Sequence, residues 1–199
     1  MSAPGAPVGT SVQNVVSYYD IAGATTAEVQ DALNRNGPAI NQVQVFALTE
    51  WQVSWRLRPT RRLGECRLPR PDVQLTIRTI LPRWKAAAPA SAEMSSLWRS
   101  FLVAVAVHED GHKDLGLRAA AAVADTLRTF GHQRAVSCEL LVADADGAAK
   151  TVLQQFYDKN ALYDQTTGHG ATQGVMWPPL RIRGTDSLPL PAFWIEYAH

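Results

Sequence analysis

Residues 97–131 read LWRSFLVAVAVHEDGHKDLGLRAAAAVADTLRTFG, and this stretch decides the expected architecture. Several of its residues recur at intervals of three and four, which is the period of one face of an α-helix. They are Phe101, Val105, His108, His112, Leu115, Ala119, Ala122 and Val123. Gly131 follows as a natural C-terminal stop, because glycine readily adopts the left-handed conformation that ends helices. The stretch therefore predicts one long helix.

A helix of this length is unusual in a small domain. It would begin within residues 91–96, and Gly111 and Gly116 lie inside it. Glycine lowers helix stability by about 1 kcal/mol relative to alanine, so a kink or break is expected near one of these two positions. A second helix is predicted from about residue 148 to 163 by its inward apolar and aromatic positions.

Alternating apolar and polar residues predict strands in the first half of the chain. The strands cover residues 15–21, 42–57 and 73–81, the second being one long strand or two joined near 49–50. Thr25 and Glu28 have the spacing of a capping box, which predicts a short helix after the first strand. The arginine-rich segment 59–71 is typical of a hairpin connection. Together these elements predict an α+β fold, in which a small antiparallel sheet packs on the long helix. A second helix follows the long helix in the sequence.

Composition along the chain predicts its domain organisation. Residues 1–14 are rich in Pro, Gly and Ser and are expected to form a flexible N-terminal arm. Residues 15–175 are expected to form one domain, and 176–199 a Pro-rich C-terminal extension without a clear period. A chain of 199 residues with 46% hydrophobic and 19% charged residues can form its own core.

Charge and hydropathy exclude several classes of partner. A formal net charge of +1 gives no electrostatic reason to expect nucleic acid or an anionic membrane. The longest strongly apolar run, 101–107, is too short to span a bilayer. The N-terminus lacks the basic start and apolar stretch of a secretory signal, so the protein is either cytoplasmic or the mature form of an exported protein. Cys66 and Cys138 form either a disulfide or two separate thiols, and their number does not decide between these.

The long helix carries the segment Val107-His108-Glu109-Asp110-Gly111-His112. Two histidines four residues apart project from the same face of a helix, one turn apart, and can bind a single Zn²⁺ ion. Glu109 follows the first histidine directly, where a carboxylate can reach a metal-activated water without binding the metal. The segment therefore predicts a zinc hydrolase with His108 and His112 as ligands and Glu109 as general base.

A catalytic zinc takes three protein ligands and keeps one position open for water. One known extension of this motif places a third histidine six residues after the second, but Arg118 occupies that position. The third ligand must come from the remaining histidines or the downstream acids. These are His132, His169, His199, Asp114, Asp125, Glu139, Asp158 and Asp164. Gly168 and Gly170 slightly favour His169, because glycines let the backbone approach a crowded site closely.

Two further roles are expected near the end of the second helix. Asp164 can accept the second N–H of a ligating histidine and fix its tautomer, or it is a helix-end carboxylate in a turn. Tyr163 or Tyr157 can donate a hydrogen bond to a developing oxyanion. The commoner fate of a tyrosine on the inner face of a helix is to be a core aromatic, and this alternative is favoured for both.

Several short motifs occur in a fixed order along the chain. They are YYDIAG (18–23) with Thr25, TEW (49–51), LPRW (81–84), HEDGH (108–112), Cys138 and YDQTTGHG (163–170). This combination, from about residue 18 to 174, resembles a bacterial family of unknown function whose members are regarded as predicted secreted zinc-dependent proteases. The resemblance leaves the N-terminal arm and the Pro-rich tail unexplained.

The resemblance implies a zincin-like peptidase that is exported and acts on a peptide or protein substrate. It implies that the block at 163–170 lies near the metal, which makes His169 the expected third ligand, and it favours a disulfide between Cys66 and Cys138. Two alternatives are another zinc hydrolase, such as a cell-wall amidase, and a non-catalytic module with a structural zinc. The substrate that is cut would identify an amidase, and a fourth protein ligand in place of water would identify a structural site.

Overall fold

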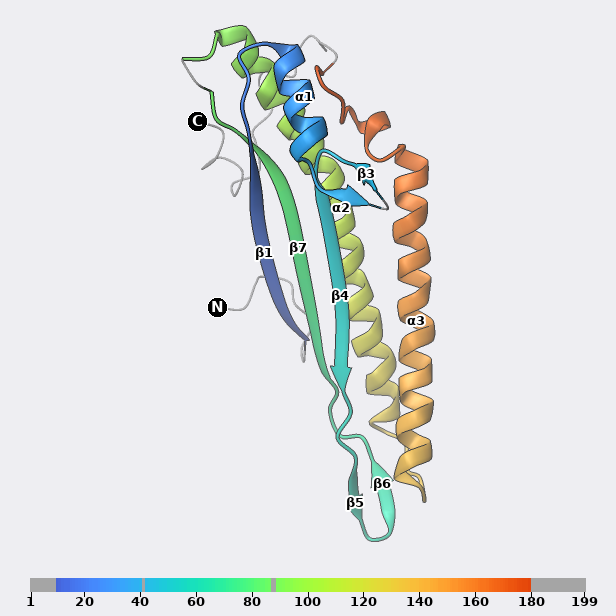
Figure 1. Ribbon diagram of the computed structural model, residues 1–199. Coiled ribbons are helices and arrows are strands. Elements are labelled where there is room, and N and C mark those ends of the chain that lie inside the picture. The colour runs from blue at the N-terminus through green and yellow to red at the C-terminus, as the bar shows by residue number, and fades with distance from the viewer. Residues whose placement is uncertain (1–9, 41, 87–88, 180–199) are drawn as a thin grey trace. The chain divides into compact units, whose positions relative to one another are not determined.

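The computed structural model describes residues 10–40, 42–86 and 89–179, so the arm residues 1–9 and the tail from 180, including His199, lie outside it. Within these ranges the chain forms helices and small sheets (Figure 1). Their order is β1 (Thr10–Ile21), α1 (Thr26–Asn36), β2 (Ala39–Ile40), β3 (Val43–Gln44), β4 (Leu48–Arg56), β5 (Thr60–Arg62), β6 (Glu65–Arg67), β7 (Asp72–Trp84), α2 (Ala92–Phe130), α3 (Cys138–Thr167) and the 3₁₀ segment η1 (Ala171–Gln173). The expected α+β class is confirmed. Among the described residues, no helix combines the length and the apolar character needed to cross a membrane.

The chain divides into two compact units, each with its own core. The first unit comprises the described residues of the ranges Met1–Val15, Glu50–Ile77 and His112–Leu162. The second comprises those of Val16–Thr49, Arg78–Gly111 and Tyr163–His199. One sheet has three strands in the order β1-β7-β4, while β2–β3 and β5–β6 are two-stranded antiparallel ribbons.

The core of the first unit is mostly aliphatic. Alternate residues of β7 are buried, as expected for a strand with one covered face. Along α3 the buried residues recur every four positions: Leu141, Ala145, Ala149 and Leu153. On α2 the buried set is also rich in alanine: Ala119, Ala120, Val123, Ala124 and Leu127. Because alanine side chains are small, these parts of the two helices can pack closely, and Figure 1 shows them side by side.

A disulfide crosslinks the first unit. Cys66 in β6 bonds to Cys138 at the start of α3, and the two Cα atoms are 5.2 Å apart. Backbone hydrogen bonds between Cys66 and Ala135 hold the same two segments together. The pairing implied by the family resemblance is therefore confirmed.

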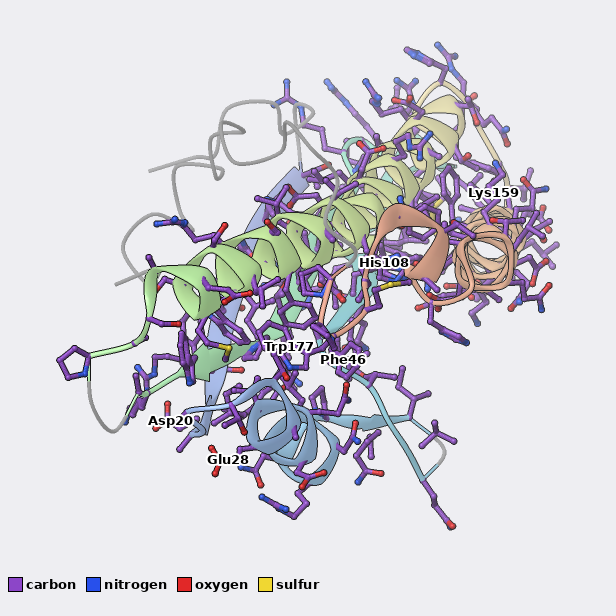
Figure 2. The ribbon with its side chains drawn as sticks, turned by 90° about the horizontal axis from the view of Figure 1, so that it is seen from above. Asp20, Glu28, Phe46, His108, Lys159 and Trp177 are labelled. Atoms are coloured by element: carbon purple, nitrogen blue, oxygen red, sulfur yellow. A yellow bond between two sulfur atoms is a disulfide. The ribbon has the colours of Figure 1, made fainter. Side chains whose placement is uncertain are left out.

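The core of the second unit is rich in aromatic rings. Phe46 and Trp177, both labelled in Figure 2, each lie 5.5 Å from the ring of Phe101, and Trp98 lies 5.3 Å from it. Trp177 is 6% exposed and its indole donates to the backbone oxygen of Thr26. The start of the segment expected to be a Pro-rich extension thus contributes a core residue.

Helix α1 begins as its sequence predicts. Thr25 is the N-cap, its side chain accepts from the backbone N–H of Glu28, and the Glu28 carboxylate accepts from that of Thr25. This reciprocal pair satisfies two backbone donors that the helix itself leaves without partners. Val29, Ala32 and Leu33 then fall on the buried face.

Of the kink or break expected in the long helix, the break is wrong. Helix α2 runs without interruption through Gly111 and Gly116. A Cβ on Gly116 would lie 2.7 Å from Cγ of Trp51, and one on Gly111 would overlap with the phenol ring of Tyr163. The two glycines are therefore positions where an aromatic ring lies against the helix backbone.

Three other element boundaries differ from prediction. β1 begins at Thr10 rather than residue 15, because Val12 also packs against the first core. The segment 42–57, expected as one strand or two joined near 49–50, forms β3 and β4 and is divided at 45–47, where Phe46 packs against the second core. α3 begins at Cys138 rather than near 148, since the Ser137 hydroxyl accepts from the N–H of Leu140, as an N-cap residue does.

Candidate metal centre

Three polar side chains of one helical turn of α2 are buried. His108, Glu109 and His112 are each 5% exposed. Removing such groups from water is costly unless they are hydrogen-bonded or bind an ion. The four-residue spacing places both imidazoles on the same face of the helix, so the helix alone brings the two predicted ligands together.

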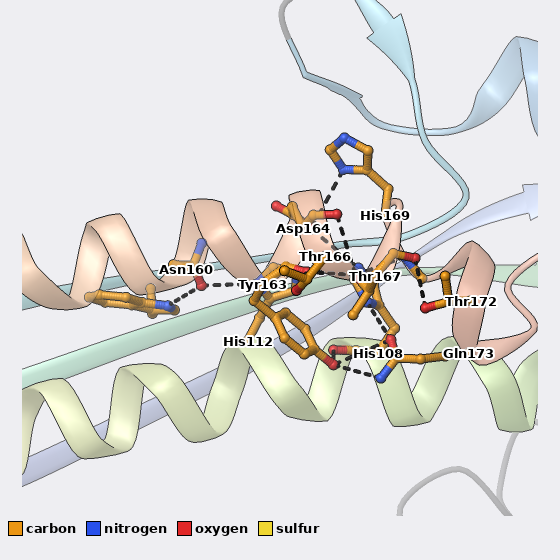
Figure 3. A network of polar contacts seen from close by, with 12 residues as sticks. His108, His112, Asn160, Tyr163, Asp164, Thr166, Thr167, His169, Thr172 and Gln173 are labelled. Atoms are coloured by element: carbon orange, nitrogen blue, oxygen red, sulfur yellow. Dashed lines mark hydrogen bonds and ion pairs between the residues drawn. The ribbon is translucent and has the colours of Figure 1, made fainter.

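Asp164 near the end of α3 completes a group that can hold a metal ion. One ligand atom from each of His108, His112 and Asp164 lies within 4.8 Å of the others. The Nε2 atom of His108 lies 3.4 Å from Oδ1 of Asp164. Both residues are labelled in Figure 3. Ligand atoms of a tetrahedral zinc are about 3.3 Å apart, given metal–ligand bonds of about 2.0–2.2 Å. Two imidazole nitrogens and a carboxylate oxygen are also donors that zinc accepts, so these residues fit the ion.

A hydrogen bond joins His112 to the side-chain amide of Asn160, and a second hydrogen bond joins that amide to the indole of Trp51. Its Nδ1 lies 2.9 Å from Oδ1 of Asn160, on α3 (Figure 3). The indole N–H of Trp51, in β4, donates to the same oxygen at 3.1 Å. The ring of Trp51 also stacks on Tyr157, with centroids 4.8 Å apart. Tyr157, an expected oxyanion donor or core aromatic, thus serves as a packing partner of Trp51.

His108 is held by a second amide. Its Nδ1 lies 3.0 Å from Oε1 of Gln173, the last residue of η1. The amide nitrogen of Gln173 donates to the hydroxyl of Tyr163 at 3.0 Å. That hydroxyl lies 3.3 Å from the carbonyl oxygen of His108, and the phenol ring stacks on the imidazole at 5.2 Å. Tyr163, expected as an oxyanion donor or, preferably, a core aromatic, therefore lies against α2 and contacts the backbone there.

A glycine turn lets η1 approach His108. Gly168, His169 and Gly170 all have positive φ, at 57°, 53° and 85°. A Cβ on Gly170 would lie 2.9 Å from Cγ of His108 and 2.6 Å from a methyl carbon of Val175. Only glycine leaves room for the histidine ring at this point.

His169, the third ligand expected from the sequence, is not in the group. Its side chain is 66% exposed, and its Nδ1 lies 3.5 Å from Oδ1 of Asp164. The left-handed turn after α3 directs the ring to solvent, while Asp164 is still on the helix and faces His108 (Figure 3). Asp164 was predicted to be a partner of a ligand, and its carboxylate lies among the candidate ligand atoms instead.

The other candidate ligands lie elsewhere in the described part of the chain. His132 is exposed, Asp114 pairs with Arg118, and Asp125 pairs with Arg128. Asp158 accepts a hydrogen bond from Gln154. The remaining acid, Glu139, accepts hydrogen bonds from its own backbone N–H and from the Ser137 hydroxyl, and these lower the pKa of its carboxyl group.

Sequence reasoning missed Asn160, Gln173 and Trp51. Asn160 lies four residues before Asp164, so both share a face of α3, and this spacing was the available signal. Gln173 lies in the glycine-rich turn that had been singled out for His169 alone. Nothing local to Trp51 indicates its role, because its partner is 109 residues away.

The fold and the cluster define an α+β protein with a candidate His₂Asp metal centre. The chain belongs to the family described as bacterial protein of unknown function (DUF922), whose family model matches residues 16–170. This span includes His108, Glu109, His112, Asp164 and both cysteines. No curated protein and no solved structure matches the chain.

Proposed function

We propose that this protein is a zinc-dependent hydrolase that cleaves peptide bonds. The observation that carries the proposal is the buried His108 and His112 pair with the Asp164 carboxylate, whose ligand atoms lie within 4.8 Å of one another. The pair belongs to a His-Glu-x-x-His segment on a helix, which is the ligand arrangement of zincin-like peptidases.

Asp164 is proposed as the third ligand in place of His169. Its Oδ1 lies at ligand spacing from Nε2 of His108, whereas His169 is directed to solvent. Three protein ligands leave one coordination position for water or substrate, which distinguishes a catalytic zinc from a structural one. The exposed His169 then flanks the carboxylate without binding the metal.

Glu109 is proposed as the general base. It is adjacent to His108 on α2 and is 5% exposed, so it acts in surroundings largely shielded from solvent. When bound, zinc would polarise the substrate carbonyl and make water acidic enough to be deprotonated near neutral pH. The Glu109 carboxylate takes up that proton and passes it to the leaving amine, which makes one residue base and then acid.

Export is part of the proposal. Disulfides persist in oxidising compartments such as the bacterial periplasm and the cell exterior, and the chain contains the Cys66–Cys138 bond. The family resemblance implies the same location. Mass spectrometry of protein taken from its native host, with free thiols blocked at lysis, should show the linked peptides. Blocked thiols at both cysteines would place the protein in a reducing compartment.

Metal analysis and a peptide library test the function. The purified protein should contain about one zinc per chain, and Asp164→Ala should lose it. His169→Ala and His132→Ala are matched controls that should keep it. Glu109→Gln should keep zinc and lose peptide hydrolysis by orders of magnitude. No zinc uptake in the wild type would overturn the site, and cleavage of muropeptides but not of peptides would identify an amidase.

Retention of zinc by Asp164→Ala together with its loss in His169→Ala would support His169 as the third ligand, as the family resemblance implies. A fourth protein ligand in the zinc-bound protein, detected by X-ray absorption, would identify a structural site.

A further inference from the structure

Two amide side chains contact the Nδ1 atoms of the two histidines. Asn160 contacts Nδ1 of His112, and Gln173 contacts Nδ1 of His108. A neutral imidazole carries its proton on one nitrogen and its metal-binding lone pair on the other. The group at Nδ1 therefore decides which nitrogen can bind a metal.

The indole of Trp51 fixes the orientation of the Asn160 amide. An indole N–H can only donate a hydrogen bond, so the atom of Asn160 that lies 3.1 Å from it must be the oxygen. The same oxygen lies 2.9 Å from Nδ1 of His112, and a carbonyl oxygen can only accept. Nδ1 of His112 must then carry the proton, which leaves the lone pair on Nε2.

The hydroxyl of Tyr163 orients the Gln173 amide in a comparable way. The hydroxyl donates to the carbonyl oxygen of His108 at 3.3 Å, an atom that can only accept. With its proton on the carbonyl, the hydroxyl accepts from the amide nitrogen of Gln173 at 3.0 Å. Oε1 then faces Nδ1 of His108 at 3.0 Å, and His108 also carries its proton on Nδ1.

We propose that Asn160 and Gln173 are positioning residues that hold both histidines as Nδ1–H tautomers, so that both present Nε2 at the metal centre before any metal arrives. Trp51 fixes the orientation of the Asn160 amide, and Tyr163 fixes that of the Gln173 amide. The consequence for metal binding rests on the proposed zinc function, whereas the tautomers themselves do not. Groups of this kind change metal affinity roughly 10- to 100-fold when they are removed.

Long-range ¹H–¹⁵N NMR of the metal-free protein tests the tautomers directly. At a pH alkaline enough to keep the imidazoles neutral, His108 and His112 should both show the Nδ1–H pattern, and the exposed His132 should show the Nε2–H form that free imidazoles prefer. An Nε2–H pattern at His112 would overturn the proposal without affecting the proposed function.

Variants at Asn160 test its effect on the metal. Asn160→Leu removes the acceptor at similar volume and should weaken zinc binding roughly 10- to 100-fold in a chelator competition. Asn160→Asp keeps an acceptor oxygen and should restore both the affinity and the Nδ1–H pattern. Asn34→Leu, at an exposed position of α1, is the matched control and should change neither.

The outcomes separate the two proposals. If the wild type binds zinc and Asn160→Leu binds it with the same affinity, the positioning role of Asn160 is contradicted. The proposed hydrolase function is unaffected by that result. Nδ1–H patterns in a wild-type protein that binds no zinc would support the tautomer assignment and overturn the proposed function. If Asn160→Leu fails to fold, the comparison of Asn160→Asp with wild type and the wild-type NMR pattern still decide the question.

Discussion

The two histidines of the candidate centre are held by similar sets of residues, which differ in their hydrogen-bond donors and in the backbone that carries them. The His112 support consists of Gly116, Trp51 and Asn160. The His108 support consists of Gly111, Tyr163 and Gln173. In each, a glycine of α2 lets an aromatic ring lie against the helix, and that ring holds the amide that contacts the histidine.

The difference lies in the donors and in the backbone. The indole of Trp51 can only donate, and Asn160 lies within the long helix α3, whose first residue is Cys138 of the disulfide. The hydroxyl of Tyr163 can donate and accept, and Gln173 lies in a three-residue 3₁₀ segment between two glycines of positive φ. We therefore expect the His112 support to be the more rigid of the two, and the predictions below test this.

The largest expected effect comes from removing the disulfide. The Cys66→Ala, Cys138→Ala double variant should lower the free energy of unfolding by about 4 kcal/mol, because the bond closes a loop across a sequence separation of 72. Urea denaturation measures this. If the crosslink also makes the His112 support rigid, its removal should broaden the ¹H–¹⁵N NMR signals of the His112 ring. The signals of the His108 ring should stay unchanged. Equal broadening at both histidines would argue against the proposed difference.

Alanine at the two glycines should have the next largest effect. Gly116→Ala should cost about 2 kcal/mol, because the new Cβ meets the root of the Trp51 ring, which can move only with β4. Gly111→Ala should cost less, because it meets the outer end of Tyr163, which can swing away.

Gly147→Ala is the matched control for both glycine variants. Gly147 is also inside a helix, but a Cβ there would meet nothing within 4 Å, so this variant should stabilise by about 0.5–1 kcal/mol. Thermal unfolding ranks the three. A larger cost at Gly111 than at Gly116 would reverse the assignment of the rigid side.

Loss of a single donor should have a smaller effect. Tyr163→Phe should cost about 1 kcal/mol, since it removes one partly buried hydrogen-bonding group and keeps the ring stacked on His108. Trp51→Phe should cost somewhat more, because the smaller ring also leaves space beside Gly116. Chemical denaturation gives the values. Equal costs would show that the indole contributes only its hydrogen bond.

The smallest effect is expected in acid, at an exposed carboxylate of the second unit. Hydrogen bonds from Arg83 and Lys85 lower the pKa of Asp20 from 3.8 to about 2. A lowered pKa means that the folded state binds the proton less tightly, so the stability gained is present above pH 3.8 and is lost as the pH falls toward about 2. Asp20→Asn should lower stability by a constant amount above this window and flatten the pH dependence of stability inside it, as measured by denaturation at several pH values. An altered slope of stability against pH near neutrality would contradict the assignment.

Features that depend on local geometry could be read from the sequence. The spacing of His108 and His112 determines that they share a face of α2, because the α-helix repeats every 3.6 residues wherever it forms. The capping box of Thr25 and Glu28 follows from equally local hydrogen bonding. The helix also ends before Gly131, but Gly131 is not among the glycines in the left-handed conformation that the sequence suggested for it. The burial of Glu109 with its neighbours also agrees with its position in the motif.

Features that depend on contacts between distant segments required the tertiary structure. His169 and Asp164 are five residues apart, and the left-handed turn between them turns one side chain outward while the other stays on the helix. Gly111 and Gly116 read as breaks in a helix because their aromatic neighbours come from elsewhere in the chain. The hydrogen-bonding role of Asn160 likewise depends on Trp51, which reaches it across 109 residues. Periodicity reports which face of an element is buried, but the group that meets that face is determined only when the elements pack.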